Sequence, residues 1–439
     1  MADAEPQFIE VARLRVGHYV FIDLSWLSHP FPLNSFRIAS AEQIETIKSL
    51  GIERIRYCPA RSDPEAVKSC AAEAVSVNAA SDSPSTREPA SEPVAMVEEG
   101  DDDNRRARRE MLASQRASLI ACERQFGEAA RVYRQVVDLS RVHPDEAREH
   151  SENMVHGVLN ALLAQEETCI RLLSEKMGER SSMHAVNVSV VSLLLGRACG
   201  LSPELLFDLG LGAMLHDIGK IELPDRLRWP SAQLSGAEQQ LYQEHVAHGL
   251  ALGKKMGLTK EVLLVIAQHH ERADGKGYPL HLAGERISQA ARIVALVNYY
   301  DGLCNPGNPA AALTPHEALS HIFAHAKAHF DPATLSTFIR MMGVYPPGSV
   351  VQLSDERFAL VVSVNSTRPL RPLVIIHDQH VPKDEALIVA LEERPELGIR
   401  RSLRPLQLPA ATIDYLSPRQ RICYYFERAR DPAGSGGGE

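Results

Sequence analysis

The 439 residues exceed what one compact domain usually holds, and with 44% hydrophobic residues the chain can bury sizeable cores. The formal net charge of −9 argues against a general electrostatic grip on a nucleic acid polymer or an anionic membrane. The seven scattered cysteines do not suggest a disulfide framework, the first residues lack the pattern of a signal peptide, and no apolar run is long enough for membrane insertion. We therefore expect a cytoplasmic protein.

Residues 1–70 predict a small α/β domain. The runs FIEVARLRVGHYVFID and SFRIAS are rich in Val, Ile, Phe and Tyr, as strands are. Ser40 and Gln43 form a capping-box pattern that opens a helix, and Gly51 is placed to end it. The run IERIRY then predicts another strand.

Residues 71–104 predict a disordered linker, because their Ser, Pro, Ala and acidic side chains cannot bury enough apolar surface to offset the entropy of ordering. A helical connector follows at residues 105–150, in which residues 105–137 predict one long helix with a charged, solvated or partner-facing side. This helix could pair with a second copy in a homodimer or pack within the chain, and the sequence leaves both open.

Helical periodicity dominates residues 151–345. Residues 346–430 predict a short β-rich segment with the strand-like runs SVVQL, FALVVSV and PLVIIH, and residues 431–439 predict a flexible tail. The expected fold is therefore a mainly α domain that is preceded by a small α/β domain and followed by a β-rich segment.

Five histidines and one aspartate recur in order near predicted helix ends. Individually, each has a plain interpretation, since a histidine on an apolar stripe is most often a buried residue without a catalytic role. Together they offer imidazole and carboxylate donors without sulfur, which suits iron, manganese or zinc, and their number implies two ions. The set comprises His184, His216, Asp217, His245, His269 and His270.

The local patterns around these residues predict their positions. Gly219 should end the apolar helix that leads to His216, and Lys220 follows at once. The capping box that Ser235 and Glu238 form should open the helix that carries His245. Further along the chain, Asn298 and Asp301 are three residues apart and so share one face of a helix.

The stretches MLHDIGK (214–220), HHERADGKGYP (269–279) and FDP (330–332) resemble, in this order, the HD-GYP family of bacterial cyclic di-GMP phosphodiesterases, a branch of the HD metal-dependent phosphohydrolases. The resemblance covers about residues 175–345. The first unit resembles the domain of undefined function that often precedes HD-GYP domains, particularly in VARLRVGHYV and SWLSHPF.

The resemblance implies an HD-type helical bundle that hydrolyses cyclic di-GMP to pGpG and/or GMP by attack of a metal-bridged hydroxide. Diguanylate cyclases or other signalling proteins would be further partners. The cofactor would be two divalent ions, with iron or manganese preferred and zinc or nickel as alternatives. The implied metal ligands are His184, His216, Asp217, His245, His269, His270 and Asn298.

The same resemblance assigns the remaining site residues. Asp217 and Lys220 would be catalytic, and Lys220 would also hold a phosphate oxygen of the substrate. The loop that would line the substrate pocket contributes Asp274, Gly275, Gly277, Tyr278 and Pro279.

Three positions depart from the family pattern. Asn298 stands where the family usually has an aspartate ligand, so metal affinity should be lower or the preferred metal different. Gly307 stands at the place of an arginine that helps bind a substrate phosphate, a loss on the order of 1–3 kcal/mol. Arg180 replaces the glutamate of members with three metals, which favours two.

These departures keep a second function open, namely a catalytically weakened or inactive receptor or scaffold in cyclic di-GMP signalling. A third interpretation, an HD hydrolase of another nucleotide, is disfavoured by the GYP loop.

Overall fold

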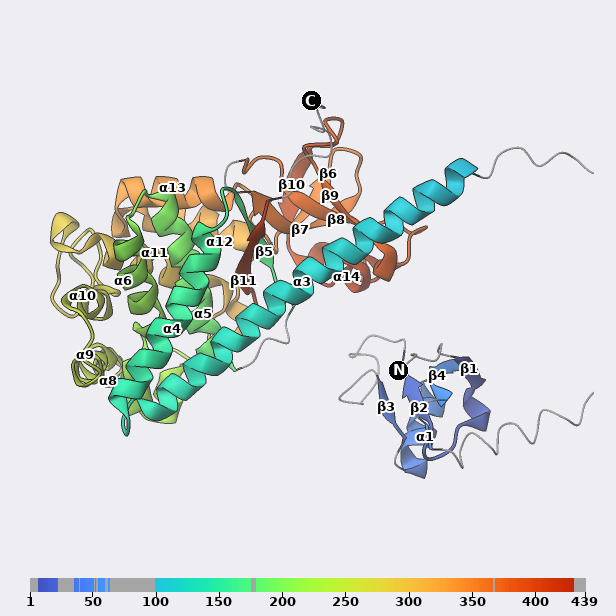
Figure 1. Cartoon of the computed structure of the whole chain (residues 1–439), viewed down its shortest axis with the longest axis horizontal. Coiled ribbons are helices and arrows are strands. Elements are labelled where there is room, and N and C mark those ends of the chain that lie inside the picture. Colours follow the sequence, from blue (N-terminus) through green and yellow to red (C-terminus); the bar gives the residue numbers. More distant parts are fainter. Residues whose placement is uncertain are drawn as a thin grey trace, which may run out of the picture. The chain divides into compact units, whose positions relative to one another are not determined.

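The computed structural model of the chain describes residues 7–22, 35–38, 40–50, 52, 54–59, 62–63, 99–174, 179–365 and 368–429. It contains two compact units, residues 1–96 and 97–439 (Figure 1). The stretch SWLSHPF, residues 71–98 of the predicted linker and the predicted tail lie outside the described residues.

The first unit is a four-stranded antiparallel sheet, in the order β1-β4-β2-β3, with one helix. Val20, Ile47 and Ile55 belong to its small apolar core. The predicted strands and helix are confirmed, although Ser40 makes no side-chain capping hydrogen bond at the N-cap position. The elements are β1 (Gln7–Glu10), a 3-10 turn (Val11–Arg13), β2 (Tyr19–Phe21), β3 (Ser35–Arg37), α1 (Ala41–Ser49) and β4 (Arg54–Tyr57).

The second unit is built around α5 (Arg180–Ala198), in which every residue from Ser182 to Gly196 is buried. Apolar residues occur on all sides of this helix, so it lies in the core, packed against α3, α6, α11 and α13. The other helices are α3 (Glu99–Leu139), α4 (Pro144–Leu163), α6 (Pro203–Leu215), α7 (Asp225–Arg228), α8 (Gly236–Gln243), α9 (His245–Lys255), α10 (Lys260–Gln268), α11 (Gln289–Cys304), α12 (Pro315–His321), α13 (Pro332–Met342) and α14 (Ala410–Leu416).

A seven-stranded antiparallel sheet packs at one end of this bundle (Figure 1). The three strand-like runs are confirmed as β6, β7 and β8. Strand β5 lies between α4 and α5 in sequence but pairs with β7 and β11, so the C-terminal segment is joined to the helices in one unit. The strands are β5 (Thr168–Leu172), β6 (Val350–Leu353), β7 (Phe358–Asn365), β8 (Leu373–Ile376), β9 (Ile388–Ala390), β10 (Ile399–Leu403) and β11 (Tyr424–Arg428).

The long helix α3 begins at Glu99, so residues 99–104, which we predicted as linker, are helical. The acidic sequence at this point is favourable at a helix N-terminus because of the helix dipole. The helix runs from the bundle across the C-terminal sheet (Figure 1), where the Gln115 amide exchanges hydrogen bonds of 3.0 and 2.8 Å with the backbone of Ile388. Part of its predicted partner-facing side is therefore covered by the chain itself. Within the described residues, no helix combines the length and apolar character needed to cross a membrane.

Candidate metal centre

Four helix ends deliver the predicted imidazoles and Asp217 to one place in the interior. His184 lies in the first turns of α5, and His216 is the C-cap residue of α6 with Asp217 directly after it. His245 is the first residue of α9. His269 is the C-cap residue of α10 and His270 follows.

Two helix boundaries differ from the sequence prediction. The apolar helix before His216 ends at Leu215, not at Gly219, and continues as the 3-10 helix η5 (Ile218–Glu222). The capping box of Ser235 and Glu238 is confirmed, but it opens α8, and His245 starts the next helix. A Cβ atom on Gly219 would lie 2.0 Å from the carbonyl oxygen of His245. Gly219 is therefore needed for the close backbone contact between η5 and α9.

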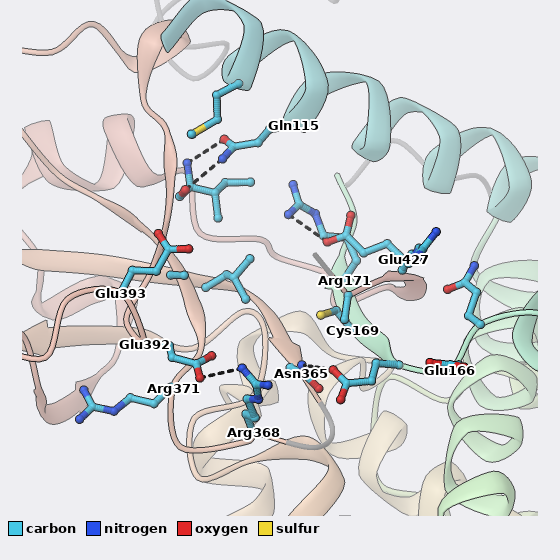
Figure 2. Close-up of a pocket in the computed structure, with 18 of the residues that line it drawn as sticks. Gln115, Glu166, Cys169, Arg171, Asn365, Arg368, Arg371, Glu392, Glu393 and Glu427 are labelled. Atoms are coloured by element: carbon cyan, nitrogen blue, oxygen red, sulfur yellow. Dashed lines mark hydrogen bonds and ion pairs between the residues drawn. The ribbon is translucent and has the colours of Figure 1, made fainter. Parts of the chain in front are cut away.

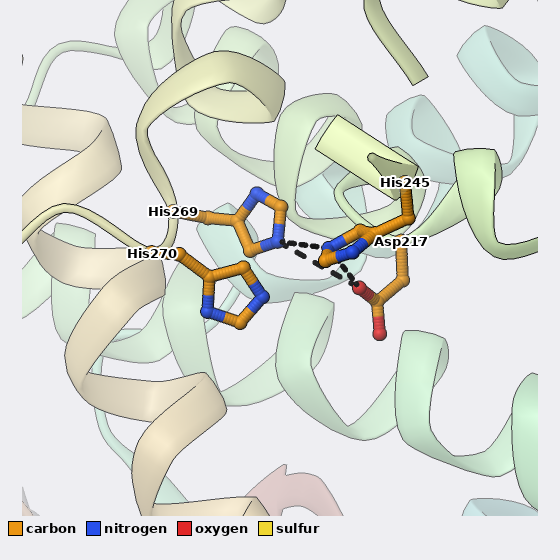
Figure 3. Close-up of side chains that lie close together, drawn as sticks. All are labelled: Asp217, His245, His269 and His270. Carbon is orange, nitrogen blue, oxygen red and sulfur yellow. Dashed lines mark hydrogen bonds and ion pairs between the residues drawn. The ribbon is translucent and has the colours of Figure 1, made fainter. Parts of the chain in front are cut away.

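The donor atoms form two groups that share Asp217, and within each group they all lie within 4.8 Å of one another. His245, His269 and His270 surround one side of the carboxylate (Figure 3), and His184 and His216 the other. Oδ1 lies 3.5 Å from Nε2 of His245 and 3.6 Å from Nε2 of His269. Oδ2 lies 3.4 Å from Nε2 of both His184 and His216. Each carboxylate oxygen thus faces one group of imidazoles.

Hydrogen bonds fix the tautomers of these imidazoles. His216, His245 and His269 each donate Nδ1–H to the carbonyl oxygen three residues earlier, over 2.7, 2.6 and 2.8 Å. A carbonyl oxygen only accepts, so the proton of the neutral ring must be on Nδ1. The lone pair of Nε2 therefore points at the shared space, as a metal ligand requires.

The protonation states also suit metal binding. Burial lowers the pKa of His216 to about 4 and that of His245 to about 3, and it holds the pKa of His270 well below its usual range. Burial alone would raise the pKa of Asp217, but the charges of Lys220 and His216 hold it well below its usual range. Neutral imidazoles and an ionised carboxylate are the forms that coordinate cations.

His184 is different because two carboxylates flank it. Its Nδ1–H donates to Oδ2 of Asp301 over 2.6 Å, and both side chains of the pair are buried. Burial lowers the pKa of His184, but the carboxylates of Asp217 and Asp301 outweigh burial and raise the pKa to about 9. A metal ion at this group would have to displace a proton from Nε2.

The unsatisfied atoms of the cluster fit divalent ions. Among the residues that the structure describes, neither oxygen of Asp217 has a hydrogen-bond donor, although Lys220 Nζ forms a 2.5 Å ion pair with Oδ2. Nε2 of His270 is also buried without a partner within the described residues. Buried polar atoms without partners are rare in folded proteins, and here they converge on one space with nitrogen and oxygen donors only. Two ions that share Asp217 would satisfy all of them.

The GYP loop is fastened to the metal ligands. Glu271 is 2% exposed and accepts hydrogen bonds from the backbone N–H groups of Leu280 (2.7 Å) and Leu282 (2.9 Å). The N–H of Tyr278 donates to the carbonyl oxygen of His270 (3.1 Å). The Tyr278 ring stacks on the His270 imidazole, with centroids 4.5 Å apart. The loop therefore forms a rigid wall beside the cluster.

The conformation of this loop requires its two glycines and its aspartate. A Cβ atom on Gly277 would lie 2.4 Å from the backbone nitrogen of Arg272, and Gly275 has a φ of +73°. Asp274 accepts from the N–H of Lys276 over 3.0 Å and closes the turn. Pro279 follows through a cis peptide bond and is exposed. Whether these residues contact substrate remains a prediction.

The remaining predicted site residues are Asn298 and Lys220. Asn298 lies half-buried on α11, one turn before Asp301, and within the described residues its side chain makes no polar contact with the cluster. The Lys220 ammonium pairs with Asp217 and lies over the ring of Trp229, at 4.5 Å. The sequence placed Asp301 on the same helix face as Asn298, but we did not predict that Asp301 contacts His184. The only available signal was that Asp301 shares this face with a predicted ligand.

The second unit contains a larger and a smaller cavity. The larger, about 790 Å³, lies away from the metal centre between α3 and the C-terminal sheet (Figure 2). Two of its arginines form ion pairs, Arg171 with Glu427 (3.4 Å) and Arg368 with Glu392 (2.7 Å). The smaller, about 120 Å³, adjoins His184 and Asp301.

Comparisons with known proteins agree with this site. Residues 167–334 match the HD domain family, and residues 7–156 match a domain of unknown function (DUF3391). The second match spans both the small sheet unit and α3.

Three curated relatives carry phosphodiesterase names. The chain is 27% identical over 378 residues to cyclic di-GMP phosphodiesterase PA4108 of Pseudomonas aeruginosa, which covers 83% of this chain and 84% of that protein. It is 33% identical over 155 residues to cyclic di-GMP phosphodiesterase response regulator RpfG of Xanthomonas campestris, with 35% and 41% covered. It is 26% identical over 187 residues to 3'3'-cGAMP-specific phosphodiesterase 2 of Vibrio cholerae, with 42% and 34% covered. His216-Asp217 and Gly277-Tyr278-Pro279 lie within the residues that match the HD domain family, so this part of the chain is similar to HD domains and keeps the HD and GYP motifs.

Proposed function

We propose that this protein hydrolyses cyclic di-GMP to the linear dinucleotide pGpG and/or GMP in second-messenger signalling, with two divalent ions held around Asp217. The observation that carries the proposal is the pair of donor groups that share this carboxylate, one oxygen facing each. The ligands would be the five histidines and Asp217, with Asn298 as a weaker ligand. Iron or manganese fits the nitrogen and oxygen donors best, and zinc or nickel would also bind.

The proposed reaction forms one bond to phosphorus and breaks another. An oxygen of water bonds to phosphorus, the bond from phosphorus to the 3′-oxygen breaks, and the 3′-oxygen leaves with a proton. The bound ions supply Lewis acidity that polarises the phosphoryl group and makes water more acidic.

The chain's own residues hold the reacting groups. Asp217 stays ionised beside Lys220 and keeps the two donor groups together. Lys220 stays protonated, because Asp217 and Tyr242 raise its pKa although burial opposes them, so it offers fixed positive charge where phosphoryl charge develops. The Tyr278 ring on His270 excludes water from one side of the cluster. These roles need no movement of the backbone.

The nucleotide is inferred from the relatives. PA4108 and RpfG are named cyclic di-GMP phosphodiesterases, and PA4108 matches most of this chain. A relative from Vibrio cholerae is named specific for 3'3'-cGAMP, so this second cyclic dinucleotide belongs in the test.

The test is turnover with a metal count. The protein is purified without oxygen, loaded with Mn²⁺ or Fe²⁺, and incubated with cyclic di-GMP or 3'3'-cGAMP, and the products are separated by chromatography. We expect pGpG or GMP with about two ions per chain. His245→Ala should lose both metal and activity, whereas His248→Ala, a half-buried position on the same helix, should keep both. Intact cyclic di-GMP bound without turnover would overturn the proposal in favour of a receptor.

A further inference from the structure

The smaller cavity beside the metal centre has two arginines in its lining. Arg180 comes from the first turn of α5, and Arg421 from the segment just before β11. His184 and Asp301 line the side toward the metal centre. Its volume of about 120 Å³ has room for an anion the size of a phosphate, not for a whole dinucleotide.

Neither guanidinium group forms an ion pair with any residue that the structure describes. Arg180 donates to the carbonyl oxygen of Asn305 (2.7 Å), and within the described residues Arg421 makes no hydrogen bond or ion pair. Burial first, and then the positive charge of Arg421, lower the pKa of Arg180, so the two charges are close enough to repel. Asp301, the carboxylate that lines this pocket, is already bonded to His184, Asn187 and Asn305.

The surroundings also favour an anion. The N-terminus of α5 lies at the pocket, and its N-cap residue Glu179 makes no side-chain capping hydrogen bond. The partial positive charge of a helix N-terminus adds to that of the two arginines. The larger cavity differs in this respect, because glutamates as well as arginines line it and two of them pair with Arg171 and Arg368.

The pocket is continuous with the metal centre through Trp229. Its ring lies under both Lys220 (Nζ at 4.5 Å) and Arg180 (Cζ at 4.8 Å), and its edge contacts His184. A strip of positive charge therefore leads from the ion pair of Asp217 and Lys220 to Arg180 and Arg421.

Gly307 lines the same pocket but cannot supply charge. A Cβ atom there would lie 2.0 Å from the carbonyl oxygen of Pro230, so any side chain would displace the backbone. The arginine that the family pattern places here is therefore excluded by the local chain path, and the cations of this pocket come from two other segments.

We propose that Arg180 and Arg421 bind the second phosphodiester of a cyclic dinucleotide while the first is held at the metal centre. This rests on the proposed function. A cyclic dinucleotide carries two phosphodiesters in one ring, so a site that neutralises only the one being cleaved leaves the other charge unpaired. Charge-assisted hydrogen bonds from a planar guanidinium to phosphate oxygens are the chemistry that recognises it.

Arg421 is the better position to change, because it has no partner whose loss would disturb the fold, whereas Arg180 contacts Asn305 and Trp229. Arg421→Ala should raise KM for cyclic di-GMP about tenfold at low ionic strength, the modest end expected for a charged hydrogen bond at an exposed side chain. Arg421→Lys should recover part of the loss. Arg428→Ala, an exposed arginine at the end of β11, should have no effect.

A substrate with one phosphate separates the subsite from the metal centre. On bis(p-nitrophenyl) phosphate, the loss in kcat/KM for Arg421→Ala should be several-fold smaller than on cyclic di-GMP, at the same metal content. Equal losses on both substrates, or no loss on cyclic di-GMP, would overturn the subsite.

The proposed function is judged separately, by turnover of cyclic di-GMP in the unmodified protein. If that turnover is absent, equilibrium dialysis with cyclic di-GMP still decides the subsite, since Arg421→Ala should weaken binding about tenfold. Unchanged binding would refute it.

Discussion

Replacing Asp301 by asparagine should remove the metal ion of the His184 group while leaving the shape of the core unchanged. Oδ2 of Asp301 accepts from Nδ1–H of His184, and Oδ1 accepts from the side-chain amides of Asn187 and Asn305. An asparagine has one oxygen and one NH₂ group for these two places. If the oxygen faces the two amides, the NH₂ group faces His184 and forces the proton onto Nε2, where the ligand lone pair should be.

The magnitude follows from the contacts. Partners that orient a ligating histidine typically change metal affinity by about 10- to 100-fold, or about 1.4–2.8 kcal/mol. We expect a change at the upper end of this affinity range, because the hydrogen bond from His184 to Asp301 is short (2.6 Å), is buried and is made to a charged group. We therefore expect the affinity for one of two Mn²⁺ ions to fall by about 100-fold.

The assay is a Mn²⁺ titration followed by a metal count after dialysis, with a thermal melt of each variant as a check on folding. The matched control is Asp208→Asn, the same chemical change at a carboxylate on α6 that accepts from Thr259 (3.1 Å), remote from the cluster. Full retention of both ions by a folded Asp301→Asn protein would refute the assignment of His184 as a ligand through Nε2.

Three further predictions follow from the same geometry. Asn298→Asp should raise metal affinity and turnover, because a carboxylate binds cations more strongly than an amide; unchanged metal binding would mean that residue 298 is not a ligand. Because the pKa of His184 is raised to about 9, its proton is lost as pH rises, so Mn²⁺ affinity should increase between pH 6.5 and 9, and a flat titration curve would contradict this. Glu271→Gln should lower the unfolding free energy by about 1–3 kcal/mol and raise KM, because one backbone N–H of the GYP loop then faces an NH₂ group. The exposed Glu285→Gln is the control, and equal melting temperatures of the two variants would contradict a stabilising role of Glu271 in this loop.

The helix ends that carry the clustered histidines were predictable because each has its own local signal in the sequence. His216 and His269 are C-cap residues at the ends of apolar helices, and the periodicity of those helices is visible in the sequence. What periodicity does not encode is which helix ends meet. The sharing of Asp217 between two groups depends on the backbone contact of Gly219 with α9, which only the fold reveals.

The residues that sequence reasoning missed act across long separations. Asp301 reaches His184 over 117 positions, and Arg421 joins Arg180 from the far end of the chain. Strand β5 was missed for a similar reason, since TCIRL becomes a strand by pairing with β7 and β11, which follow it by nearly two hundred residues or more. Such pairings depend on tertiary packing, and local propensity is a weak guide to them.

The free-energy cost of the unsatisfied buried atoms in the cluster favours a metal-dependent enzyme over a scaffold that no longer binds metal ions. Without ions, Oδ1 of Asp217 and Nε2 of His270, which have no hydrogen-bond partner within the described residues, each cost about 1–3 kcal/mol. Their sum is a large share of a typical unfolding free energy of about 5–15 kcal/mol. Ions that bind only the folded state offset that cost by mass action, so the chain is most stable with its metals bound. The shared carboxylate and the fixed tautomers do not depend on Asn298, and these are the features that hydrolysis needs.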